Sequence, residues 1–70
     1  MNTTTISKSS ALHTALNYAG LAIKECHCVY NNLSEGLFEI CVNTPYQRYE
    51  FYVEEKTGEV LGINAEPLFT

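Results

Sequence analysis

Residues 37–54 read LFEICVNTPYQRYEFYVE, and this stretch decides the fold because its apolar residues recur at every second position. A period of two is typical of β-strands that bury one face. Residues 43–46 (NTPY) interrupt the pattern and predict a turn, since proline fixes φ and lacks an N–H donor. We therefore expect a hairpin whose buried face carries Phe38, Ile40, Val42, Tyr49, Phe51 and Val53, and whose other face carries Arg48, Glu50, Tyr52 and Glu54.

Two further strands are expected on either side of this hairpin. Alternation over residues 26–30 (CHCVY) predicts a first strand, followed by a loop at residues 31–36 (NNLSEG). Residues 55–58 (EKTG) predict a tight turn whose glycine takes a positive φ. A last short strand then runs over residues 59–64, and Pro67 stops it.

Residues 7–20 (SKSSALHTALNYAG) carry the signals of a helix. Ser7 is the expected N-cap, Ile6 is placed for a hydrophobic staple, and Gly20 is the expected C-cap. Strands that are polar on one face need cover on the other, and this helix is the element available to supply it. We predict an α+β fold in the order α-β-β-β-β, with one N-terminal helix packed on one face of a four-stranded antiparallel sheet. The packed stripe comprises Ala11, Leu12, Ala15, Leu16 and Ala19.

The length and charge of the chain limit its function. Seventy residues make one domain, expected over residues 6–66 between a disordered arm (1–5) and a short tail (67–70). A net charge of −4 with only four basic residues cannot form a nucleic-acid surface. The sequence contains neither an apolar run long enough for a membrane span nor the apolar segment of a signal peptide, which predicts a cytoplasmic protein for the chain as written.

The chain has three cysteines that could form a metal or redox site: Cys26, Cys28 and Cys41. Their spacing does not support such a site. Alternation points His27 away from the first two thiols, and no zinc-type ligand spacing is present. We expect Cys26 and Cys28 to pack as small apolar residues beside the helix, and Cys41 to be an exposed thiol on the opposite face. We therefore predict neither a bound metal nor a cofactor.

No catalytic residues are expected either. The two histidines are predicted to lie at the surface, and nothing in the sequence assembles a nucleophile, a base and an oxyanion donor. The carboxylates around the predicted turn at residues 55–58 are expected to be solvated rather than paired in a cleft. The apolar and aromatic residues among the glutamates of the open sheet face instead suggest a protein partner.

The order of these segments resembles that of a PepSY domain from about Ile6 to Ile63. The similarity includes an alanine-rich helix that ends in Ala-Gly, an aromatic strand and a Thr-Gly-Glu-Val-Leu hairpin. The residues that carry it are Ile6-Ser7, Ala11, Ala15-Leu16, Ala19-Gly20-Leu21, Leu37-Phe38-Glu39-Ile40, Tyr49-Glu50-Phe51-Tyr52-Val53 and Lys56-Thr57-Gly58-Glu59-Val60-Leu61.

The resemblance implies the helix-on-sheet fold and a role without catalysis. PepSY domains occur in the propeptides of thermolysin-type secreted metallopeptidases and in bacterial envelope proteins, where they are thought to inhibit or regulate peptidases. The family is mostly extracytoplasmic, in contrast to the cytoplasmic reading of this chain. The resemblance thus implies a metallopeptidase partner, and we expect contact through Arg48, Glu50, Tyr52 and Glu54.

Two alternatives remain open at this point. One is an assembly domain that homodimerises through the open sheet face. The other is a ligand or metal sensor that uses Cys26, Cys28 or Cys41.

Overall fold

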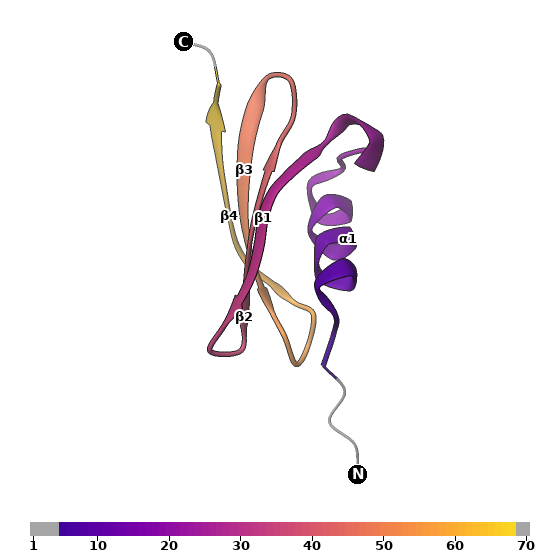
Figure 1. The fold of residues 1–70 in the computed structure, drawn as a ribbon, viewed down its shortest axis with the longest axis vertical. Coiled ribbons are helices and arrows are strands. Elements are labelled where there is room, and N and C mark those ends of the chain that lie inside the picture. The colour runs from indigo at the N-terminus through magenta and orange to yellow at the C-terminus, as the bar shows by residue number, and fades with distance from the viewer. Residues whose placement is uncertain (1–4, 69–70) are drawn as a thin grey trace.

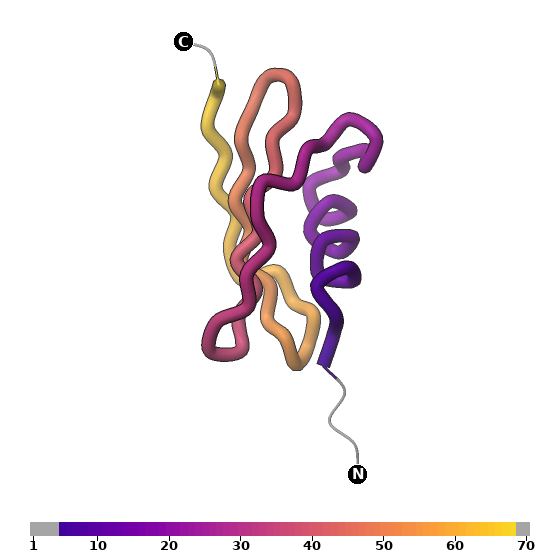
Figure 2. Tube along the Cα trace, in the orientation of Figure 1, coloured from indigo at the N-terminus to yellow at the C-terminus, as the bar shows by residue number. Residues whose placement is uncertain are grey.

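The computed structural model describes residues 5–68 and contains one α-helix, one short 3-10 helix and four strands. The strands form one antiparallel sheet in the order β1-β2-β3-β4, so each strand pairs with its neighbour in sequence. Figures 1 and 2 show α1 along one face of this sheet, while the other face has no element over it. The predicted α+β fold is therefore confirmed. The elements are α1 (Lys8–Ala19), η1 (Ile23–Glu25), β1 (His27–Ser34), β2 (Leu37–Asn43), β3 (Gln47–Glu54) and β4 (Val60–Pro67).

Both ends of α1 are capped as the sequence predicts. The Ser7 hydroxyl accepts a hydrogen bond from the backbone N–H of Ser10 at 3.1 Å, which satisfies one of the free donors of the first turn. Gly20 ends the helix in the left-handed region at φ 71°, and the backbone N–H of Leu21 donates to the carbonyl of Leu16. Ile6 also ties the helix start to the sheet, because its N–H donates to the carbonyl of Glu55 at 3.0 Å.

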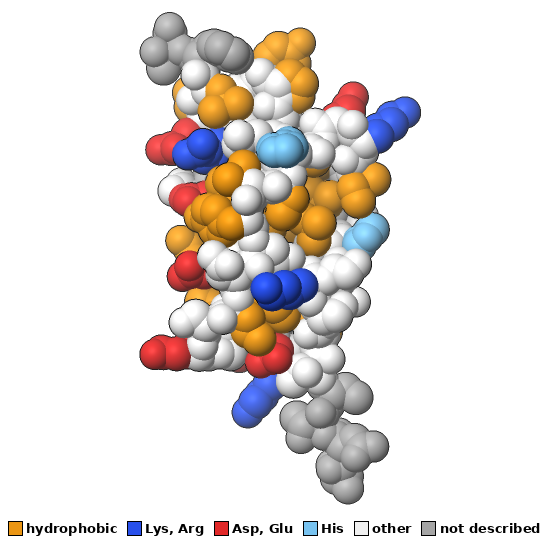
Figure 3. All heavy atoms as spheres, in the orientation of Figure 1, with side chains coloured by type: hydrophobic (Ala, Val, Ile, Leu, Met, Phe, Trp, Pro, Cys, Tyr) orange, Lys and Arg blue, Asp and Glu red, His pale blue; other side chains and the backbone are white. Residues whose placement is uncertain are grey.

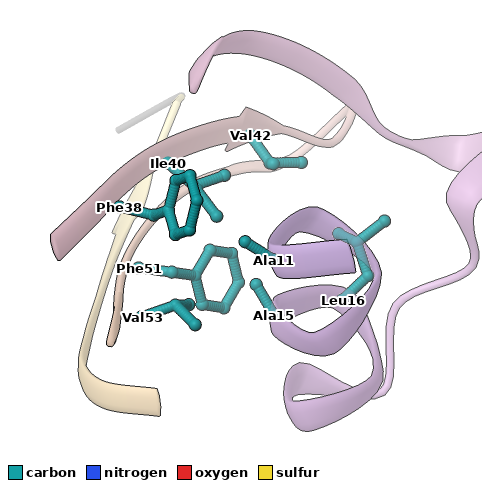
Figure 4. Packing of buried hydrophobic residues seen from close by; sticks show 8 residues of the cluster. All are labelled: Ala11, Ala15, Leu16, Phe38, Ile40, Val42, Phe51 and Val53. Carbon is teal, nitrogen blue, oxygen red and sulfur yellow. The ribbon is translucent and has the colours of Figure 1, made fainter. Parts of the chain in front are cut away.

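The core is one layer between α1 and the covered sheet face (Figure 4). Small alanine side chains on the helix lie opposite large side chains on the two central strands, so the helix packs close to the sheet. Tyr49 stacks on Phe51 with ring centroids 6.1 Å apart and extends the layer beyond its buried centre. The buried cluster comprises Ala11, Ala15, Leu16, Phe38, Ile40, Val42, Phe51 and Val53.

The Gly20→Ala substitution is expected to destabilise the fold by about 1–2 kcal/mol, the usual cost of a left-handed non-glycine residue. An added Cβ at Gly20 meets no atom within 4 Å, so the cost is conformational rather than steric. Gly62→Ala is the matched control, because its Cβ makes only an ordinary 3.5 Å contact with Tyr52 and its φ is not positive. Urea unfolding of the two variants measures the difference. Equal losses of stability would contradict the assigned cap.

The predicted loop at residues 31–36 is wrong. β1 continues to Ser34, and the turn to β2 contains only Glu35 and Gly36, at φ 53° and 77°. Two successive positive φ values define the tight primed turn that joins twisted strands, which Gly36 favours. Asn31 is thus a strand residue that faces α1, and its Nδ2 donates to the carbonyl of Lys8 at 2.9 Å.

The last strand is longer than expected. β4 runs to Pro67, three residues past the predicted end. Proline is tolerated here because it is the final residue of an edge strand, where only one side of the backbone is paired. Pro67 therefore belongs to the sheet rather than to a tail, while most of the expected arm (residues 1–4) and residues 69–70 lie outside the described residues.

Candidate functional site

The four residues predicted for partner contact lie together on the open sheet face. Arg48, Glu50, Tyr52 and Glu54 alternate along β3 with the buried Phe51 and Val53, as the period of two requires. β3 is a central strand, so this row has neighbours on both sides. On the β2 side the pairs are Asn43 with Arg48, Cys41 with Glu50, Glu39 with Tyr52 and Leu37 with Glu54. On the β4 side they are Glu66 with Arg48, Asn64 with Glu50 and Gly62 with Tyr52.

Hydrogen bonds to other side chains hold three of these residues in place, namely Arg48, Glu54 and Glu50. Arg48 donates from Nε to Oδ1 of Asn43 at 3.3 Å. The Thr57 hydroxyl donates to Oε1 of Glu54 at 2.7 Å. A surface whose side chains are already ordered loses less conformational entropy when a partner binds.

Glu50 is held by a residue two strands away. The Tyr30 hydroxyl on β1 donates to Oε2 of Glu50 on β3 at 3.1 Å. Tyr30 and Glu50 are the register partners of Cys41 on either side, so their hydrogen bond spans the small Cys41 side chain between them. Burial and the hydrogen bond to Glu50 both raise the pKa of the Tyr30 phenol.

The expected exposure of Cys41 is wrong. Alternation places Cys41 on the open face, yet only 1% of its surface is accessible, because Tyr30 and Glu50 cover it from the neighbouring strands. Burial is the largest cause of a raised pKa of the Cys41 thiol, with smaller opposing effects from Arg48, which lowers it, and Glu50, which raises it. A buried thiol with a raised pKa is a poor nucleophile and a poor metal ligand.

The other two cysteines differ in how exposed their side chains are. Cys26 is half-buried and packs against the core as predicted, and burial raises the pKa of its thiol. Cys28 is exposed, which corrects the expectation of a core residue. Cys28 pairs with the buried Val42 but lies on the edge strand β1, and a β-bulge separates it from Tyr30, which pairs with Cys41 of the open face. Within residues 5–68, no group of three or more His, Cys, Asp or Glu side chains lies close enough to hold a metal ion.

We predict that thiol reagents label Cys28 faster than Cys41 in the folded protein, because the cover of Tyr30 and Glu50 excludes the reagent. Tyr30→Ala removes the cover and should speed Cys41 labelling by at least about tenfold. Tyr30→Phe, which keeps the ring, should give a smaller increase. Labelling with a maleimide followed by peptide mass mapping assigns the rates. Equal rates for Cys28 and Cys41 in the native protein would contradict the covered position.

The open face is predominantly acidic. Glu39, Glu50, Glu54 and Glu66 all occupy its strand positions, and Figure 3 shows acidic side chains along the margin away from α1. Among the described strand residues, Arg48 is the one lysine or arginine. A face of this charge favours a partner surface that carries basic groups and disfavours another acidic surface.

A shallow hollow of about 440 Å³ lies at one end of the core layer. It is open to solvent, and its walls come from the segment after α1 including η1, from the turn between β2 and β3, and from the start of β3. It is separate from the row of predicted contact residues, and its lining lacks any histidine, cysteine or cation. The lining comprises Leu21, Glu25, Thr44, Pro45, Tyr46, Gln47 and Tyr49.

Comparisons with protein-family models, with characterised proteins and with solved structures find no match to this chain. The PepSY resemblance therefore stays a prediction. Among residues 5–68, the helices are too short or too polar to cross a membrane. The residues that sequence reasoning missed are Tyr30, Asn43 and Thr57, whose side chains hold the predicted contact row in place.

Proposed function

We propose that this chain is a noncatalytic protein-binding module that presents the open face of its sheet to a partner. The observation that carries the proposal is the ordered row on β3, in which Arg48, Glu50 and Glu54 are each fixed by a neighbouring side chain. Tyr52 stands half-buried among them and supplies the apolar area that protein contacts use. An open sheet face with both charged and aromatic groups is suited to a protein surface rather than to a small substrate.

The partner that we propose is a thermolysin-type metallopeptidase, which the PepSY resemblance suggests. The acidic face adds a condition that the resemblance does not contain, namely that the contact surface of the peptidase carries basic groups. Binding would then weaken as salt is added, since exposed charges are screened beyond about 8 Å at physiological ionic strength.

The charge of the open face weighs against one alternative, and the burial of Cys41 weighs against the other. A homodimer through the open face would bring Glu39, Glu50, Glu54 and Glu66 of one copy against the same residues of another, which is unfavourable. A sensor based on cysteine would need an accessible cluster of thiols, whereas Cys41 lies beneath Tyr30 and Glu50.

The test is a titration of thermolysin with the purified chain, followed by cleavage of a fluorogenic peptide. Saturable inhibition, with the intact mass of the chain unchanged afterwards, is the expected result. Simple digestion of the chain, or full peptidase activity at a large excess of chain, would contradict a regulatory role toward this class of enzyme. Repeating the titration at high salt checks the electrostatic part, because inhibition should become weaker.

A further inference from the structure

The two edges of the sheet differ in how they are protected against pairing with another strand. β4 carries Glu66 and Pro67 near its end and a register irregularity opposite Tyr52 and Val53. Charges, prolines and bulges are the usual means by which natural edge strands avoid further pairing. β1 reads HCVYNNLS and contains no Lys, Arg, Asp or Glu, although it has a bulge near its start. Residues 60–65 of β4 are also uncharged, so the difference lies at the strand ends, where β4 has Glu66 and Pro67 and the second half of β1 has neither a charge nor a proline.

The turn between β1 and β2 determines which backbone groups of β1 are free. In a two-residue hairpin the residues on either side of the turn, here Ser34 and Leu37, form a hydrogen-bonded pair. Pairing alternates along an antiparallel ladder, so Asn32 bonds to β2 whereas Asn31 and Leu33 do not. The N–H and C=O groups of Asn31 and Leu33 consequently point outward from the sheet edge.

Apolar side chains accompany these free backbone groups. Val29 is 45% exposed and Leu33 is 42% exposed, and each lies two residues from Asn31. In Figure 3, drawn with β1 toward the viewer, hydrophobic side chains gather along the middle of this surface around a basic side chain, and most acidic groups lie at its open-face margin. The edge thus combines free hydrogen-bonding groups with uncharged side chains, unlike the acidic open face.

We propose that two copies of this chain pair through β1, antiparallel and about a two-fold axis at Asn31. This register joins the outward backbone groups of Asn31 in the two strands and sets Leu33 of each copy opposite Val29, the residue at the bulge, of the other. Charge favours a second copy here over a contact through the open face, because β1 itself carries no charged side chain and only Lys8 lies beside Asn31, whereas the open face would bring four glutamates against four. An isologous contact of this kind closes at the dimer.

The pairing produces one eight-stranded sheet. A two-fold axis perpendicular to the sheet keeps both helices on one side and both open faces on the other. The β1 contact therefore leaves Arg48, Glu50, Tyr52 and Glu54 free in each copy, so its test is independent of the partner proposed above.

The test compares matched charge insertions at the two edges. Leu33→Lys places a cation on β1, and Leu61→Lys places one on β4, where Leu61 is 56% exposed. Sedimentation equilibrium from about 1 μM to about 1 mM covers the usual range of weak dimers. We expect the unmodified chain and Leu61→Lys to dimerise in this range, and Leu33→Lys to raise the dimer Kd at least about tenfold. A single-chain mass for the unmodified protein throughout, or equal weakening by both substitutions, would overturn the proposal.

Amide hydrogen exchange in the unmodified chain gives a second measurement that does not depend on a variant's folding. The N–H groups of Asn31 and Leu33 should be protected at high protein concentration and exchange rapidly on dilution, because only the second copy accepts their hydrogen bonds. Exchange at these two sites that does not change with concentration would overturn the β1 contact even if the chain dimerises elsewhere.

Discussion

Phe51→Ala is expected to remove about half of the chain's stability at 25 °C. Phe51 has no accessible surface, and its ring points toward Ala11 and Ala15 of α1 in the middle of the single core layer (Figure 4). Truncation of a buried phenylalanine to alanine costs about 3–5 kcal/mol. At the usual 0.05–0.15 kcal/mol per residue, a 70-residue chain has a total stability of only about 4–10 kcal/mol. The substitution therefore removes about half of the free energy of unfolding.

Circular dichroism and thermal unfolding measure this effect, and Tyr52→Ala is the matched control. Tyr52 is the next residue of β3, but it lies half-buried on the open face, so its truncation should cost clearly less than that of Phe51. A Phe51→Ala variant that still unfolds cooperatively with a loss below about 1 kcal/mol would contradict the assigned core. Equal losses for the two variants would contradict the assignment of the two sheet faces.

Ala15→Leu is expected to destabilise the fold by about 1–3 kcal/mol, the usual cost of overpacking a filled core. Ala15 is fully buried and faces the sheet, so the added carbons must push α1 away from β2 and β3 or force side chains out of their preferred rotamers. At an exposed position the same change should have little effect, because there is no filled core to overpack.

Ala22→Leu is the control for this substitution, since Ala22 is exposed between α1 and η1. Chemical unfolding of both variants should show a large decrease in the free energy of unfolding for Ala15→Leu and a small one for Ala22→Leu. If Ala15→Leu is as stable as the unmodified chain, the small residues of α1 do not set the distance between helix and sheet.

The helix and the central hairpin could be predicted from the sequence because their signals are local. Ser7 and Gly20 mark the two ends of α1 by cap chemistry that depends only on nearby backbone groups. The period of two in β3 assigns Phe51 and Tyr52 to opposite faces whatever the strand pairs with. The contact row of the candidate site was therefore correctly assigned to one face.

The errors concern β1 and what lies next to it. Residues 31–34 are asparagine, leucine and serine, which resemble a loop by composition, and only the tight turn at Glu35 and Gly36 shows that the strand continues. The β-bulge between Cys28 and Tyr30 has no sequence signal, yet it pairs Cys28 with Val42 of the covered face and Tyr30 with Cys41 of the open face. Simple alternation, which puts Cys28 and Tyr30 on one face, therefore fails here.

Cys41 shows a different limit of sequence reasoning. Alternation correctly places it on the open face, but exposure depends on the side chains of the neighbouring strands. Tyr30 covers Cys41 because the register set by the turn at Glu35 and Gly36 places the two residues opposite each other and lets the phenol reach Glu50. Such coverage follows from strand pairing, which a single sequence does not encode locally.

The central claim is that the open face of β3 binds a protein partner, and paired double variants in the thermolysin titration test it most directly. Tyr52→Ala with Glu54→Ala changes the open face, whereas Tyr18→Ala with Glu25→Ala removes an exposed tyrosine and an exposed glutamate from the helical segments. Loss of two central contact residues usually weakens binding by at least about tenfold. We predict this loss for the open-face pair and inhibition equal to that of the unmodified chain for the helical pair. Unchanged inhibition by the open-face pair, or equal loss from both pairs, would contradict the proposed contact surface.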